Sequence, residues 1–186
     1  MNRLTKKLEA FMKRNSSLWA LCGFAFVSVC GTILHFLYDW TGGSIFVAPF
    51  SAVNESTWEH MKLLFFPMLI FAIFESFFFK ERKDFWCVKL YSTLLGLILI
   101  PVIFYTYNGV IGKSPDWINI AIFFVAGAIS YYFEAKLFDK GKTKCTHPKF
   151  AFASFIIISI MFMLFTFFTP QLGIFLDPVS KKYGIS

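Results

Sequence analysis

The stretch VNESTWEHMKLLFFPMLIFAIF, from Val53 to Phe74, joins a group of polar and ionisable residues directly to a long apolar run. From Leu63 the apolar run continues to Phe79, and Glu75 is its one charged residue. A helix that crosses a bilayer needs about 20 predominantly apolar residues. The stretch therefore predicts a membrane-spanning helix whose entry is unusually polar.

The whole chain has the composition of a membrane protein. Of its 186 residues, 57% are hydrophobic and 21% are aromatic, whereas soluble domains are roughly 45–50% apolar. Four further apolar runs resemble the first, so we expect an all-α integral membrane bundle, a single transmembrane domain over residues 1–186. The five transmembrane helices are expected at about 17–38, 57–79, 85–107, 117–138 and 150–168. Residues 1–16 form a basic amphipathic lead, and residues 169–186 form a tail.

Most of the positive charge lies at alternate ends of these spans. Fourteen of the 18 basic residues precede the first span or lie in or beside the connections between spans two and three and between spans four and five: Arg3, Lys6, Lys7, Lys13, Arg14, Lys80, Arg82, Lys83, Lys89, Lys136, Lys140, Lys142, Lys144 and Lys149. Basic loops stay in the cytoplasm. We therefore expect a multi-pass protein of the cytoplasmic membrane, with its N-terminus inside and its C-terminal tail outside. The net charge of +7 then reflects topology and lipid contact, and we expect no nucleic-acid partner.

The cysteines and the tail carry weaker signals. Cys22, Cys30 and Cys87 fall in apolar segments, and no pair shows metal or redox spacing, so Cys145 is expected to be a reduced thiol of a cytoplasmic loop. The tail is too apolar to be free. It either rests on the outer mouth of the bundle or adsorbs to the membrane surface, and 172–176 or 44–50 could also dip into the bilayer.

The loop after the first span brings two groups of ionisable residues together. His35 and Asp39 are four residues apart and share a helix face, and the loop returns the chain to Glu55, Glu59 and His60. Two imidazoles and a carboxylate suit zinc, iron or manganese. We expect His35, His60 and Glu55 as metal ligands, with Glu55, Glu59 and Asp39 as candidates for acid–base catalysis. Paired histidines could also ligate haem, although no attachment motif is present.

Part of this polarity has a purely structural interpretation. Ser56 and Glu59 fit a capping box, in which each side chain bonds the other's backbone N–H, and Lys62 fits an anchor at the lipid surface. Glu75 and Glu134 near the inner face are expected to pair with Lys89 or with loop lysines. The further candidates for the site are Asn54, Lys62, Glu75 and Asp177.

Three stretches carry a family resemblance: LHFLYDWTGG (34–43), FSAVNESTWEHMKL (50–63) and FTFFTPQLGIFLDPVSKKYGI (165–185). Together they resemble a family of small bacterial polytopic membrane proteins of unknown function. The second stretch matches its Val-Asn-Glu-Ser-x-Trp-Glu-His-x-Lys motif, and the third its Asp-Pro…Tyr-Gly-Ile terminus. The chain departs at Ser180-Lys-Lys182, where that family usually has Thr-Gly-Thr. The resemblance implies no activity, but it implies that all three motifs lie on the outer side and share a site.

Three functions remain open from the sequence. The first is a metal-dependent, membrane-embedded hydrolase that acts on a lipid or small amphiphile at the outer leaflet. The second is a proton- or ion-coupled carrier of small solutes that uses the same residues together with Glu75. The third is a non-catalytic membrane subunit, in which the polar residues only cap and anchor helices. The sequence predicts neither the substrate nor the oligomeric state.

Overall fold

The structure is a computed structural model that describes residues 16–112, 115–141 and 143–185. Within these residues the chain forms five long α-helices and one short 3₁₀ helix. They are α2 (Ser16–Trp40), α3 (Thr57–Ser76), α4 (Phe85–Ile111), α5 (Asp116–Lys140), α6 (Pro148–Phe167) and η1 (Gly173–Phe175). Apart from its last residue, the predicted basic lead at 1–16 lies outside the described residues.

All five long helices are long and apolar enough to cross a membrane, which confirms the predicted all-α, five-helix architecture and indicates a multi-pass membrane protein. The orientation and the division into one domain stay predictions. The helix ends differ from the predicted spans. α3 ends at Ser76, because the chain then turns and places the Phe79 side chain in the core at 7% exposure. α4 continues to Ile111 and ends at Gly112, whose φ of 96° suits glycine.

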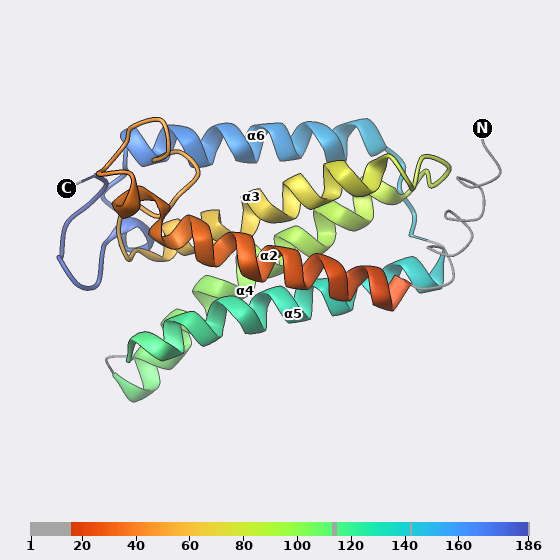
Figure 1. The fold of residues 1–186 in the computed structure, drawn as a ribbon. Coiled ribbons are helices and arrows are strands. Elements are labelled where there is room, and N and C mark those ends of the chain that lie inside the picture. The colour runs from red at the N-terminus through yellow and green to blue at the C-terminus, as the bar shows by residue number, and fades with distance from the viewer. Residues whose placement is uncertain (1–15, 113–114, 142, 186) are drawn as a thin grey trace.

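α3 is the central helix of the bundle. α2 contacts α3 and α5, while α4 contacts α3, α5 and α6. Figure 1 shows α6 and α5 on opposite sides of α3 and α4. Of the span of α3, 61% is buried, against 22% for α6. The outer helices therefore present most of their side chains to lipid, and any polar side chain of α3 needs a partner inside the protein.

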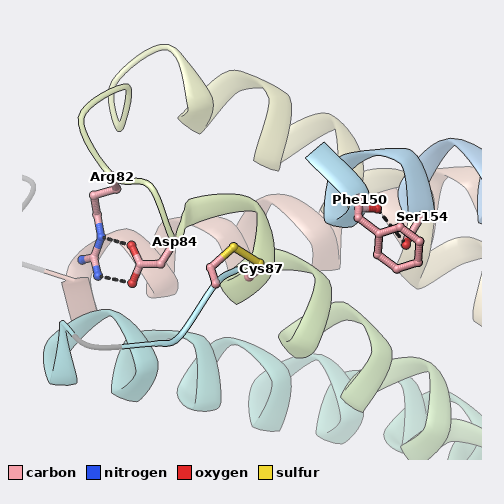
Figure 2. The surroundings of a disulfide bond; sticks show 6 residues. Arg82, Asp84, Cys87, Phe150 and Ser154 are labelled. Carbon is pink, nitrogen blue, oxygen red and sulfur yellow. Dashed lines mark hydrogen bonds and ion pairs between the residues drawn. A yellow bond between two sulfur atoms is a disulfide. The ribbon is translucent and has the colours of Figure 1, made fainter. Parts of the chain in front are cut away.

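At one end of the bundle the connections carry the basic residues, and we call this end the basic face. A disulfide there joins Cys87 near the start of α4 to Cys145 before α6, residues 58 apart in sequence (Figure 2). The expectation of a reduced thiol at Cys145 is wrong. Sequence spacing gave no signal for this bond, because only the packing of α4 against α6 brings the two Cα atoms to 5.8 Å.

The opposite end, which we call the site face, holds the segment 41–56 and the tail side by side (Figure 1). The tail folds back on the bundle. The side chain of Phe175 is 4% exposed, and its ring packs 4.6 Å from that of Trp58 in α3. Residues 44–51 form hydrogen-bonded turns, and η1 lies against α3. The tail therefore packs against the end of the bundle, which is the first of its two predicted placements.

Candidate metal centre

The three predicted metal ligands converge at the site face. His35 lies one and a half turns before the end of α2, Glu55 lies in the connection 41–56, and His60 lies in the first turn of α3. The Nε2 atom of His35 is 3.7 Å from Oε1 of Glu55, and the Nε2 atom of His60 is 3.6 Å from Oε2 of Glu55. One ligand atom from each residue lies within 4.8 Å of the other two.

These separations suit ligands that share an ion. Hydrogen bonds between nitrogen and oxygen are about 2.7–3.2 Å long, shorter than either contact. Ligands about 2.0–2.2 Å from a tetrahedral metal are about 3.3–3.6 Å from one another. The two histidine rings lie in edge-on contact, with their centroids 5.6 Å apart, which leaves no space for a haem between them. The geometry favours a small cation.

A backbone carbonyl orients the His60 ring. Nδ1 of His60 lies 2.9 Å from the carbonyl oxygen of Ser56, one turn earlier. Because a carbonyl only accepts, Nδ1 carries the hydrogen, so in the neutral ring the lone pair of Nε2 faces Glu55. This is the hydrogen-bonding arrangement usual behind a metal-ligating histidine. Nδ1 of His35 is buried and has no hydrogen-bond partner among the described residues.

Hydrogen bonds on both sides hold the segment that carries Glu55. Oδ1 of Asn54 accepts from the backbone N–H of Ser56 at 2.9 Å, and Nδ2 of Asn54 donates to the carbonyl of Gly184 in the tail at 2.9 Å. The Ser56 hydroxyl accepts from the N–H of Glu59 at 3.4 Å and caps α3. The predicted capping box is therefore half wrong: Asn54, not Glu59, binds the Ser56 N–H, since an Asx turn bonds its own backbone two residues on.

The Glu55 carboxylate is ionised at neutral pH. Its polar interaction with the His35 imidazole lowers its pKa below the ordinary value, against the opposing effect of partial burial, and the charge of His60 adds to the lowering. The side chain remains 43% exposed. Glu55 is thus a charged group at the mouth of the cluster, available to a ligand from outside.

Glu59 and Lys62 lie apart from this cluster and bind each other. Nζ of Lys62 is 2.6 Å from Oε2 of Glu59, and it donates to the Ala48 carbonyl at 2.8 Å and to the Thr166 hydroxyl at 2.9 Å. The same Glu59 oxygen accepts from the N–H of Val53 at 3.0 Å. Lys62 is fully buried, so its interpretation as a lipid-surface anchor is wrong. The pair fastens the 41–56 segment and α6 to α3.

The remaining predicted site residues have different surroundings. Asp39 is exposed and interacts electrostatically with His35. Asp177 is 6% exposed and binds its own turn, accepting from the Val179 N–H and the Ser180 hydroxyl, both at 2.7 Å. It also interacts electrostatically with His60. Glu75 lies at the other end of α3, about 22 Å along the axis from His60.

A cavity of about 100 Å³ lies beside the two histidines, between α2, α3 and α5. Its walls are mostly apolar: Gly31, Thr32, Phe36, Leu63, Ile120, Phe123 and Phe124. Gly31 permits the close approach of α5, because a Cβ at this position would lie 2.5 Å from Cζ of Phe123. Phe36 and Ile120 at the rim are 45% and 54% exposed. The cavity therefore opens sideways between α2 and α5, toward the surface that faces lipid.

A family model for DUF6512, described as a family of unknown function, matches residues 8–185. The chain belongs to this family. No curated protein and no solved structure matches the chain. The family match agrees with the predicted resemblance to a family of unknown function, and it assigns no activity to the converging side chains.

Sequence reasoning missed the partners that support the cluster. The Ser56 carbonyl is a backbone group and leaves no residue-type signal. Thr166 is 104 residues from Lys62, and nothing in its local sequence distinguishes it from other hydroxyls of apolar helices. For the cavity, the signal was present but unread: Gly31 and His35 are four apart and share one face of α2.

Proposed function

We propose that this protein is a metal-dependent hydrolase embedded in the membrane, with His35, Glu55 and His60 as the metal ligands. The observation that carries the proposal is the convergence of these side chains, at metal-ligand separations, beside an apolar cavity that opens toward lipid. Capping of α3 accounts for Ser56 but not for this convergence.

Two histidines and one glutamate are a donor set of catalytic zinc sites, and three protein ligands leave a coordination position for water. Iron and manganese accept the same donors. Such a metal supplies a nucleophile near neutral pH by lowering the pKa of its bound water. When Nδ1 of His60 donates to the Ser56 carbonyl, the neutral ring has Nε2 free of hydrogen, which is the form that binds a metal.

Two carboxylates are candidates for the acid–base step. The Glu55 carboxylate is 43% exposed at the mouth of the cluster, with one oxygen near each histidine. Asp39 is exposed on α2 and interacts electrostatically with His35. Glu59, the third predicted candidate, is engaged by Lys62 and by the Val53 N–H. We therefore place proton transfer on Glu55 or Asp39 and give Glu59 a structural role.

The cavity suits an amphiphilic substrate. Its opening between α2 and α5 admits a hydrocarbon group from the bilayer, while the charged cluster lies at the membrane surface beside it. An ester, amide or phosphoester between head and tail would then lie near the metal. Because the basic loops are at the other end, we place this site at the outer surface of the cytoplasmic membrane.

The carrier hypothesis requires a polar path through the bundle, and the described residues show an apolar layer instead. Leu63, Leu64, Met68, Phe71 and Phe123 form one buried cluster between the site and Glu75. A subunit without a site would need no cavity beside the histidines. The hydrolase is therefore the function that the geometry supports best.

Metal content tests the proposal directly. The full chain in lipid nanodiscs is loaded with zinc, washed, and analysed for bound metal, and lipid extracts are screened by mass spectrometry for cleaved products. We expect about one metal per chain in the wild type, loss of metal and of cleavage in His60→Ala, and no change in His147→Ala. The control histidine lies at the basic face, before α6. Equal metal content in His60→Ala and wild type would contradict the proposal.

A further inference from the structure

A second group of ionisable residues lies inside the bundle near the basic face. The ammonium of Lys89 in α4 contacts the carboxyl groups of Glu75 in α3 and Glu134 in α5, the latter at 2.6 Å. The Ser92 hydroxyl also donates to Glu134 at 3.0 Å. The three ionisable side chains are at most 3% exposed. Pairing of both glutamates with Lys89 agrees with the sequence analysis, but burial of all three side chains is a finding of the tertiary structure.

Aromatic rings enclose these residues on both sides. Nζ of Lys89 lies 5.7 Å from the ring centres of Phe71, Phe85 and Phe138 and 5.8 Å from that of Tyr131. Toward the basic face, Phe79 stacks on Phe85 and Phe138. This aromatic layer separates the charges from the loops that carry the remaining lysines, so no loop cation reaches them among the described residues.

The charges of the enclosed group do not balance. Two carboxylates and one ammonium carry a net charge of −1, and an uncompensated charge inside a membrane protein is costly. We propose that Glu75, Lys89 and Glu134 form a proton-binding site, which holds one proton per chain at neutral pH. The group is then one ammonium, one carboxylate and one carboxylic acid, with no net charge.

The hydrogen bonds place the proton on Glu75. Glu134 accepts from Lys89 and from Ser92, which are the donors that stabilise a carboxylate. Glu75 forms an ion pair with Lys89, but among the described residues neither of its oxygens has a partner that meets hydrogen-bond geometry. The other titratable group that faces the site is Tyr131 of α5, whose ring centre lies 5.8 Å from Nζ of Lys89. The neutral acid therefore belongs on the carboxyl with fewer donors.

This site does not depend on the proposed hydrolase. The apolar cluster of Leu63, Leu64, Met68 and Phe123 separates it from His60, and no metal ligand takes part in it. Its proton exchanges with water only when the aromatic layer around Phe79, Phe85 and Phe138 opens. A conformational change at the basic face is therefore coupled to proton release.

Infrared spectroscopy of the full chain in bilayers counts the protonated acids. We expect one carboxylic-acid carbonyl band at neutral pH in the wild type, sensitive to deuterium, and its loss in both Glu75→Gln and Glu134→Gln. Either substitution leaves one carboxylate paired with one ammonium. The group is then neutral without a bound proton. Lys89→Met removes the ammonium and should add a second acid band.

Glu59→Gln is the matched control. Glu59 is also buried, but Lys62 pairs with it one to one, so the acid band should persist unchanged in this variant. The proposal would be overturned if the wild-type spectrum had no carboxylic-acid band, or if its band persisted in both Gln variants. A band that disappears in Glu75→Gln alone would also overturn it, because the proton would then belong to one residue and not to the balance of three. If Lys89→Met does not fold, the wild type and the two Gln variants still decide.

Discussion

His60 directs Nδ1 to the carbonyl oxygen of Ser56 at 2.9 Å, and this contact fixes which nitrogen faces the cluster. Ser56 is also the N-cap of α3 and binds the Glu59 N–H. One residue therefore begins the helix, sets its first turn, and holds the ring of the candidate ligand. Formation of the helix and preparation of the metal site are the same local event.

Loss of the Glu55 charge should weaken metal binding. In Glu55→Gln the side chain keeps its size but loses the negative oxygen near both histidines, and we expect the affinity for zinc to fall at least about 10–100-fold. Titration with a competing chelator measures this change. Asp39→Asn, which alters a nearby exposed carboxylate without removing a ligand, should change the affinity less than Glu55→Gln.

The pH dependence of binding should follow the histidines and not Glu55. The lowered pKa of Glu55 keeps it ionised as the pH falls through the range in which ordinary histidines take up protons. A depressed carboxylate contributes above its ordinary pKa and loses its effect only below its lowered value. Because protons compete with zinc for the imidazoles, the affinity for zinc should begin to fall near pH 6–7 and should decrease steadily as the pH is lowered further. An affinity that stays constant down to about pH 4 would contradict ligation by the imidazoles.

Filling the close approach at Gly31 should disturb the cavity. In Gly31→Ala the new methyl group would lie 2.5 Å from the Phe123 ring and 3.1 Å from the Leu63 carbonyl oxygen. We expect a loss of about 1–3 kcal/mol in the free energy of unfolding, since the helices cannot separate without losing contacts. Lipid cleavage should fall, while zinc affinity, which depends on untouched ligands, should stay within a few-fold.

Gly127→Ala is the matched control for Gly31→Ala. A methyl group there meets the Phe24 ring at 3.5 Å, an ordinary contact, and alanine favours a helix by about 1 kcal/mol over glycine. Equal stability losses in the two variants, measured by unfolding in mixed micelles, would contradict the importance of the Gly31 contact.

Removal of the buried lysine should destabilise the site face. Lys62→Met leaves the Glu59 carboxylate buried without its cation, which typically costs about 3–5 kcal/mol. Thr166→Val removes one of the three partners of Lys62 and should cost only about 1–3 kcal/mol. The double variant Glu59→Gln with Lys62→Met should recover part of the loss. If Lys62→Met and the wild type unfold at the same detergent composition, Lys62 does not hold the 41–56 segment and α6 to α3.

The disulfide should stabilise the basic face. Serine at both Cys87 and Cys145 should lower the free energy of unfolding by about 2–4 kcal/mol, because the bond closes a long segment of chain. Reductant should destabilise the wild type equally and leave the double variant unaffected. Cys22→Ser, at a free and exposed cysteine, is the control and should be neutral.

The sequence alone determined the class of fold. Five apolar runs of spanning length require helices, because a lipid-exposed backbone must satisfy its own hydrogen bonds. It also identified His35, Glu55 and His60 as candidates for a shared site, because helix capping does not explain why ionisable residues lie beside an apolar run. The helix ends at Ser76 and Ile111 were missed, since hydropathy does not distinguish a helix from an apolar turn.

Only the tertiary structure decided what each ionisable group does. Glu59 and Glu55 are four residues apart, yet one is buried against Lys62 and the other is open to the cluster. Cys145 forms a disulfide with Cys87, which is 58 residues away in sequence. Lys89 lies between Glu75 and Glu134, which are about 14 and 45 residues away. Local patterns fix helices, because their bonds are local. Partners of buried charges are set by the packing of α3, α4, α5 and α6, which no single segment encodes.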